Sequence, residues 1–176
     1  ASKRVAALLA GLASKLAVLA IVRILLLVFP HEEARQLLLV LGILGVITGE
    51  LAAYQARDIT RMLGWSSVGQ LGVVFIAFSL PGKAGLIAGV TVAMHHLVVK
   101  SALFLLADRW GGAIDRLRGA ASVSRPGAAM FVLFSLSLLG LPPLPGFWSK
   151  FLVLGGLAAA GSTLQLAGRA IIFAGA

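Results

Sequence analysis

Long apolar segments follow one another along almost the whole of this 176-residue chain, with short polar segments between them. Hydrophobic residues make up 60% of the sequence and charged residues only 12%, whereas about one quarter of an ordinary globular domain is charged. A helix of about 20 apolar residues crosses the hydrocarbon core of a membrane. The sequence therefore predicts an all-α membrane protein: a polytopic helical bundle of about six transmembrane helices, forming a single transmembrane region.

The predicted spans are bounded by polar residues or prolines. They cover residues 5–29, 37–56, 60–80, 84–107, 127–141 and 147–161, and the short apolar stretch 163–174 is a candidate start of a seventh. Residues 31–35 and 108–125 are predicted to be polar connections, and Asp58 is predicted to cap the third span. The chain begins with Ala1, and its first apolar run is too long for a signal peptide, so we expect a portion of a longer protein.

Three lysines lie inside these apolar segments: Lys15, Lys100 and Lys150. A lysine in the hydrocarbon core costs a few kcal/mol, and intramembrane lysines usually mark an ion or proton path. Three of them in different helices are hard to explain by packing alone. The sequence therefore favours a protein that moves protons or cations across a membrane.

The span over residues 84–107 has the densest polar content. His96 and Lys100 are four residues apart and share one helix face, whereas His95 points about a quarter-turn away. Imidazole titrates near neutral pH, and burial disfavours the charged form of a lysine. The pattern predicts a proton relay through His96 and Lys100, with His95 and Glu50 as possible additional members. Alternatively, the histidines bond to backbone or hydroxyl groups of neighbouring helices, and Glu50 either pairs with a buried lysine or lies at the membrane interface.

Three prolines, Pro142, Pro143 and Pro145, interrupt the chain directly before Lys150. Proline donates no backbone hydrogen bond, and broken helices near the middle of the membrane recur in transporters. The segment 140–146 is thus either the break of a discontinuous helix that lines a cavity or an ordinary loop between two spans.

Several classes of protein are excluded by composition. The chain has no cysteine, which rules out thiolate iron–sulfur and zinc sites within it. No nucleophile–histidine–acid set, glycine-rich phosphate loop or metal-ligand spacing is present, so we expect no catalytic residues, no cofactor and no metal. The net charge is +9, but the basic residues lie mostly in loops and at helix ends, as the positive-inside rule describes, and we expect no nucleic-acid binding.

Four segments, in order along the chain, carry motifs that recur together in one family. Residues 11–23 contain Gly-Leu-Ala-Ser-Lys, and residues 96–107 begin His-Leu-Val-Val-Lys. Residues 58–72 read Asp-Ile-Thr-Arg-Met-Leu-Gly-Trp-Ser-Ser-Val-Gly-Gln-Leu-Gly, and residues 140–151 read Gly-Leu-Pro-Pro-Leu-Pro-Gly-Phe-Trp-Ser-Lys-Phe. Together they resemble the antiporter-like membrane subunits of respiratory complex I, of Mrp-type cation/proton antiporters and of membrane-bound hydrogenases.

The resemblance implies a C-terminal portion of an inverted-repeat transporter fold, with the first repeat incomplete. By motif, Lys15 matches the first-repeat lysine and Lys100 the central connecting lysine. Lys150 matches the exit-side lysine of the second repeat, and His96 matches the histidine four residues before the central lysine. In the family these groups form a hydrated polar axis, in which charging one lysine shifts its neighbours electrostatically.

The resemblance also implies a function: translocation of protons or of a cation such as Na⁺. The partners would be other membrane subunits of the same complex and the lipid bilayer, in the inner membrane of a bacterial or archaeal cell. The chain would be a transporter and not an enzyme, although its complex could be a proton-pumping NADH:quinone oxidoreductase. Two features depart from the family: Thr60 replaces the usual lysine, and a helix with a pairing glutamate is missing upstream of Lys15. The alternatives are a structural subunit without transport and, less favoured, a solute permease.

Overall fold

The computed structural model describes residues 13–28, 32–110, 114 and 119–160. This part of the chain forms seven helices: α2 (Ser14–Leu27), α3 (Glu32–Tyr54), α4 (Ile59–Ser79), α5 (Gly82–Trp110), α6 (Ala120–Val123), α7 (Arg125–Leu139) and α8 (Pro145–Ala160). The predicted all-α class is confirmed. Helices α3, α4 and α5 are each long and apolar enough to cross a membrane. The candidate seventh span, residues 163–174, lies outside the described residues.

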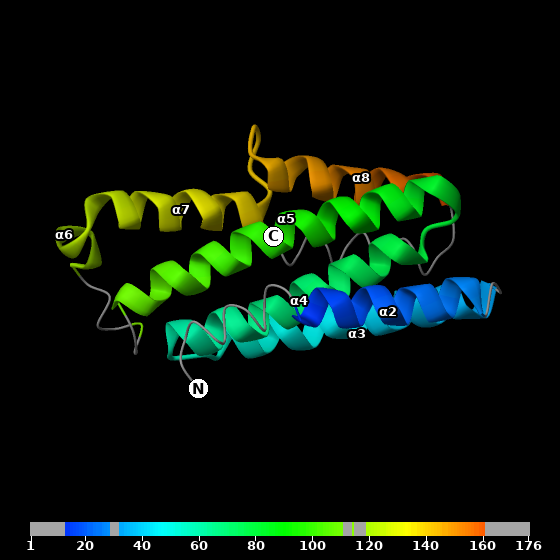
Figure 1. The fold of residues 1–176 in the computed structure, drawn as a ribbon, viewed down its shortest axis with the longest axis horizontal. Helices are drawn as coiled ribbons and strands as arrows, with labels where there is room; N and C mark the ends of the chain where they lie inside the picture. The colour runs from blue at the N-terminus through cyan, green and yellow to red at the C-terminus, as the bar shows by residue number, and fades with distance from the viewer. Residues whose placement is uncertain (1–12, 29–31, 111–113, 115–118, 161–176) are drawn as a thin grey trace.

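The helices pack in succession. Helix α3 packs along α4, α4 packs on α5, and α5 contacts both α7 and α8, while α2 lies against α3 and α4 (Figure 1). Helices α7 and α8 follow one another end to end along α5 (Figure 1). They have 15 and 16 residues, so each is only about 22–24 Å long, shorter than the roughly 30 Å hydrocarbon core. Within the described residues three helices are long and apolar enough to cross a membrane, and the shorter α7 and α8 lie end to end along α5 (Figure 1).

The break between these halves has a defined geometry. Helix α7 ends at Gly140, whose φ of 86° places it in the left-handed region that favours glycine. Residues 141–144 then form turns, and α8 begins at Pro145. Residues 140–144 thus join two short helices that lie end to end (Figure 1).

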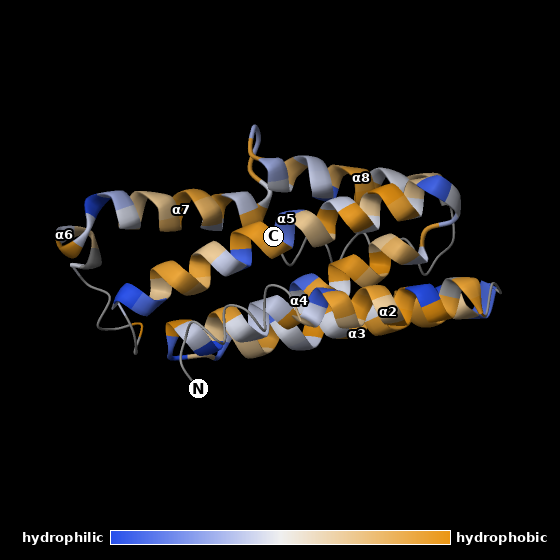
Figure 2. Cartoon of the chain, in the orientation of Figure 1, coloured by the Kyte–Doolittle hydropathy of each residue, from blue (hydrophilic) through white to orange (hydrophobic). Residues whose placement is uncertain are grey.

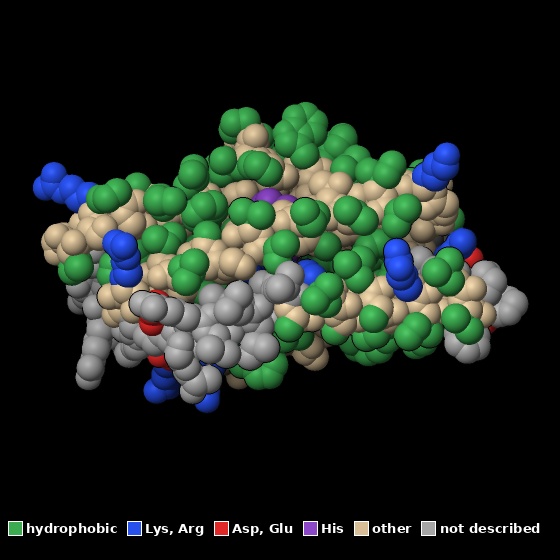
Figure 3. All heavy atoms as spheres, viewed as in Figure 1, with side chains coloured by type: hydrophobic (Ala, Val, Ile, Leu, Met, Phe, Trp, Pro, Cys, Tyr) green, Lys and Arg blue, Asp and Glu red, His purple; other side chains and the backbone are tan. Residues whose placement is uncertain are grey.

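The surface of the described residues is that of a membrane protein. Apolar ribbon segments run through the middle of the long helices (Figure 2). On the face shown in Figure 3, apolar side chains cover the centre and the basic side chains gather mainly towards the two ends. Large apolar side chains such as Leu51, Leu86 and Val98 are exposed, as lipid-facing positions require.

Within the described residues, two helix boundaries differ from the sequence prediction by three residues or more. The predicted polar connection over residues 31–35 is wrong from residue 32, because Glu32 and Glu33 form the first turn of α3. Acidic residues stabilise a helix N-terminus, and Arg35 pairs with Glu32 at 3.6 Å. Helix α5 continues to Trp110, three residues past the predicted end at residue 107.

The predicted cap of α4 is confirmed. The carboxylate of Asp58 accepts hydrogen bonds from the backbone N–H groups of Thr60 and Arg61, at 2.9 and 3.1 Å. These are two of the four N–H groups that a helix start leaves without a backbone partner. The cap therefore fixes the start of α4, the helix on which both α3 and α5 pack.

Removing this cap is expected to lower stability modestly. The substitution Asp58→Ala leaves both N–H groups without the carboxylate and should cost about 1 kcal/mol of unfolding free energy. Thermal unfolding of the purified protein measures the effect. Asp58→Asn is the control, because an asparagine at the N-cap keeps the acceptor oxygen and should retain most of the stability; equal loss in both variants would contradict the capping role.

Candidate functional site

The core of the candidate site is one face of α5. His96 and Lys100 both have 0% exposed surface, and they share this face as the sequence predicts. The Nζ of Lys100 donates a hydrogen bond to the carbonyl oxygen of Leu63 on α4, at 3.2 Å. The same oxygen accepts a bond from the hydroxyl of Ser67 at 2.8 Å. Lys100 is thus held inside the bundle by a backbone dipole, and this contact involves no carboxylate.

The two histidines have different surroundings. The Nε2 of His95 lies 2.9 Å from the Oγ of Ser137, near the end of α7. For His95, the structure thus agrees with the alternative that a histidine bonds to a hydroxyl group of a neighbouring helix. Both ring nitrogens of His96 are buried and have no hydrogen-bond partner among the described residues. A buried polar group without a partner is costly, so packing alone gives no reason for an imidazole at this place.

The other two predicted lysines occupy different elements. Lys15 is 6% exposed on α2, and its Nζ donates to the hydroxyl of Ser14 at 3.3 Å. Lys150 lies in the second turn of α8, and its Nζ donates to the carbonyl oxygen of Leu139, the last residue of α7, at 3.2 Å. The ammonium of Lys150 therefore bridges the break between the two half-helices.

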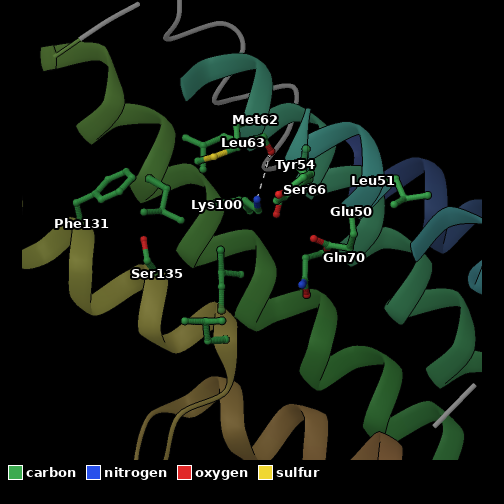
Figure 4. Close-up of a pocket in the computed structure, with 14 residues that line it drawn as sticks. Glu50, Leu51, Tyr54, Met62, Leu63, Ser66, Gln70, Lys100, Phe131 and Ser135 are labelled. Atoms are coloured by element: carbon green, nitrogen blue, oxygen red, sulfur yellow. Dashed lines mark hydrogen bonds between the residues drawn. The ribbon is translucent and has the colours of Figure 1, made fainter. Parts of the chain in front are cut away.

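Glu50 lines a cavity of about 580 Å³ that also contains Lys100. The cavity lies between α3, α4, α5 and α7, and its polar wall includes Ser66 and Gln70 of α4 (Figure 4). No direct ion pair of Glu50 occurs within the described ranges, yet its carboxylate interacts electrostatically with Lys100 and with Lys150.

Sequence reasoning gave no site role to Ser66 and Gln70. The pattern that could have identified them is their spacing of four within an otherwise apolar helix, which places both on one face. Gln70 is only 8% exposed although its amide is polar. Buried polar side chains in a membrane helix are typical of functional positions.

The ionisable residues form a connected electrostatic series. Lys15 interacts with His96 and with Lys100, and His96 also interacts with Lys100 and with His95. Lys100 interacts with Glu50, and Lys150 interacts with Glu50 and with His95. All six predicted site residues thus belong to one network. Within the described residues, no three His, Asp or Glu side chains come close enough together to hold a metal ion.

The transmembrane family described as "NADH:quinone oxidoreductase/Mrp antiporter" matches residues 1–172 of this chain. The chain belongs to this family. It is 33% identical to the D-type subunit of the Na(+)/H(+) antiporter of Alkalihalophilus pseudofirmus over 158 residues, which are 84% of this chain and 31% of that protein. It is 32% identical to the N-type subunit of the NADH-quinone oxidoreductase of Desulforudis audaxviator over 165 residues, which are 88% of this chain and 33% of that protein.

Chains of two solved membrane complexes share this fold. A chain of the Mrp complex from Dietzia sp. superposes with a TM-score of 0.83 at 26% identity, covering 96% of this chain and 33% of that one. A chain of respiratory complex I from Thermus thermophilus gives a TM-score of 0.79 at 27% identity, covering 94% of this chain and 38% of that one. The chain is an integral membrane protein of the antiporter-like type, and it spans about a third of the length of its curated relatives.

Proposed function

We propose that this chain moves protons, alone or in exchange for a second cation, across a membrane as an antiporter-like subunit of a multisubunit complex. The observation that carries the proposal is the complete burial of Lys100 at a cavity that also contains Glu50, one helical turn from a buried His96 whose ring has no hydrogen-bond partner among the described residues. A buried ammonium without a carboxylate in contact lowers the stability of the fold, and such a group in a membrane helix usually has a function that depends on its charge.

The proposed path uses Lys15, His96, Lys100 and Lys150, with Glu50 and His95 as further members. The path follows the electrostatic series, in which each group has a charged or titratable neighbour. In a low dielectric, a proton on one lysine strongly disfavours a proton on the next, so charge is passed along the series. Water in the cavity beside Lys100 would complete the hydrogen bonds that side chains alone do not span.

The finer architecture is proposed with the function. The end-to-end helices α7 and α8, with Lys150 at their break, fit the broken helix of the second repeat in an inverted-repeat transporter. We place the chain in the inner membrane of a bacterial or archaeal cell, with other membrane subunits as partners. The names of its relatives support this, since they are subunits of Na(+)/H(+) antiporters and NADH-quinone oxidoreductases.

Lys150 gives a direct test of transport. The substitution Lys150→Ala, introduced into the full-length protein within its complex, is expected to reduce proton flux into sealed vesicles by roughly tenfold or more. Flux is measured with a pH-sensitive dye after a gradient is imposed. Lys83→Ala is the matched control, because Lys83 lies on the exposed start of α5 and its removal should leave flux unchanged. If Lys150→Ala assembles and gives the same proton flux as the control, the result favours the alternative of a structural subunit without transport.

A further inference from the structure

Three oxygen-bearing side chains meet on one wall of the cavity beside Lys100. They are the carboxylate of Glu50 on α3, and the hydroxyl of Ser66 and the amide of Gln70 on α4. Figure 4 shows them on the same side of the cavity, next to Lys100, with Phe131 and Ser135 on the other side. In the part of the chain that the structure describes, none of these three side chains makes a hydrogen bond.

The wall is built to hold Glu50 in this place. Position 69 of α4 is a glycine, and a Cβ added there would lie 2.6 Å from the Oε1 of Glu50. The missing side chain leaves the space that the carboxylate occupies. Gln70, which is more than nine-tenths buried, turns its unpartnered amide to the same cavity. These polar groups open into the cavity without a hydrogen-bond donor among the described residues, so their partner is expected to be an occupant of the cavity.

The chemistry of these groups selects the occupant. Carboxylate, hydroxyl and amide oxygens are hard ligands that suit alkali and alkaline-earth cations. The wall contains one carboxylate, so it balances one positive charge, and a divalent ion would be left under-neutralised in a low dielectric. A cavity of about 580 Å³ also has room for several waters beside an ion, since a water occupies about 30 Å³.

We propose that this cavity binds one alkali-metal cation, Na⁺ in the first instance, through Glu50, Ser66 and Gln70. Lys100 lines the same cavity, and like charges in a low dielectric repel strongly, so the cation and the ammonium of Lys100 disfavour one another. This inference deepens the proposed function, on which it rests, by naming where the second ion binds and which side chain it opposes. The ammonium of Lys150 also interacts with Glu50, and its positive charge weakens Na⁺ binding as that of Lys100 does.

The test measures binding of ²²Na⁺ to the full-length protein, purified in its complex, at one fixed pH with choline as the background cation. Glu50→Gln removes the charge and keeps the shape, and it should weaken Na⁺ binding by at least about tenfold. Glu33→Gln makes the same change on the exposed start of the same helix and should bind Na⁺ like the wild type. Lys100→Met removes the opposing charge and should tighten binding. Gln70→Leu is a second ligand variant in case Glu50→Gln fails to assemble.

Unlabelled ions complete the design. Li⁺ or K⁺ should displace the label, whereas Mg²⁺ at equal concentration should not. The proposal is overturned if the wild type shows no saturable binding or if Glu50→Gln binds as tightly as Glu33→Gln, and the cavity then holds water only. It is also overturned if Lys100→Met weakens binding, because the ammonium then does not oppose the cation. If Na⁺ binding is absent while proton flux is still lost in Lys150→Ala, this inference is refuted and the proposed function stands. If Na⁺ binding depends on Glu50 while Lys150→Ala leaves proton flux unchanged, the proposed function is refuted and the cation site stands.

Discussion

Replacing Lys100 with methionine is expected to abolish proton flux and to leave the protein assembled and at least as stable as the wild type. Methionine has nearly the length of lysine and no charge, so it fills the same space on α5. Replacing buried charges by apolar groups of similar volume is often neutral or stabilising, because the cost of desolvation disappears. The carbonyl of Leu63 that loses the ammonium keeps its bond from Ser67 at 2.8 Å. The substitution therefore leaves the carbonyl oxygen of Leu63 with a hydrogen-bond donor.

The effect on flux should be large. A positioned acid–base group contributes roughly 100-fold or more to the rate of a proton transfer, and we expect a loss of that order. Proton flux in sealed vesicles and the melting temperature of the same preparation are measured together. Lys83→Met, on the exposed start of α5, is the matched control.

The paired readout separates function from structure. A functional lysine gives lost flux with an unchanged or raised melting temperature, which is the usual trade-off at a strained site. A structural lysine gives the opposite pair, a lowered melting temperature with flux retained in the assembled fraction. That second result would contradict the transport proposal and favour the alternative of a structural subunit.

The fold was predictable from the sequence where composition alone decides it. Apolar runs long enough to cross a membrane predict α3, α4 and α5, and Asp58 predicts the start of α4. The relation of residues 127–141 to 147–161 was not predictable, because two half-helices in line and two antiparallel spans have the same apolar composition. Only the packing of both halves along α5 distinguishes them.

The candidate site was also predictable from the sequence only in part. Helical spacing correctly places His96 and Lys100 on one face, because four residues make about one turn. Spacing could not tell that His95 contacts a hydroxyl on α7 while His96 has no hydrogen-bond partner in the described part of the chain, since Ser137 is 42 residues from His95 along the sequence. The grouping of Glu50 with Gln70 likewise depends on contact between two helices. Contacts across helices are set by packing, which no pattern within one helix records.

Gly49→Leu is expected to be the most destabilising of these substitutions. Helices α3 and α4 approach so closely that a Cβ at Gly49 would overlap the backbone of Gly69 and lie 3.0 Å from the carbonyl oxygen of Trp65. Backbone atoms cannot turn aside as a side chain can, so the two helices must separate. In lipid, close packing of small residues is a main source of helix association, and its loss is not offset by a hydrophobic driving force.

The expected cost is about 3 kcal/mol or more, at the upper end of the range for overpacked cores. Gly64→Leu is the matched control on α4, because a Cβ at Gly64 meets no atom within 4 Å. Thermal unfolding and the yield of assembled protein should fall for Gly49→Leu and stay near wild type for Gly64→Leu. Since Glu50 follows Gly49 directly, separation of α3 from α4 also removes the carboxylate from its place beside Gly69, and Na⁺ binding should fall in any assembled fraction. Equal stability of the two variants would mean that α3 and α4 do not make the close contact on which both the fold and the cation wall depend.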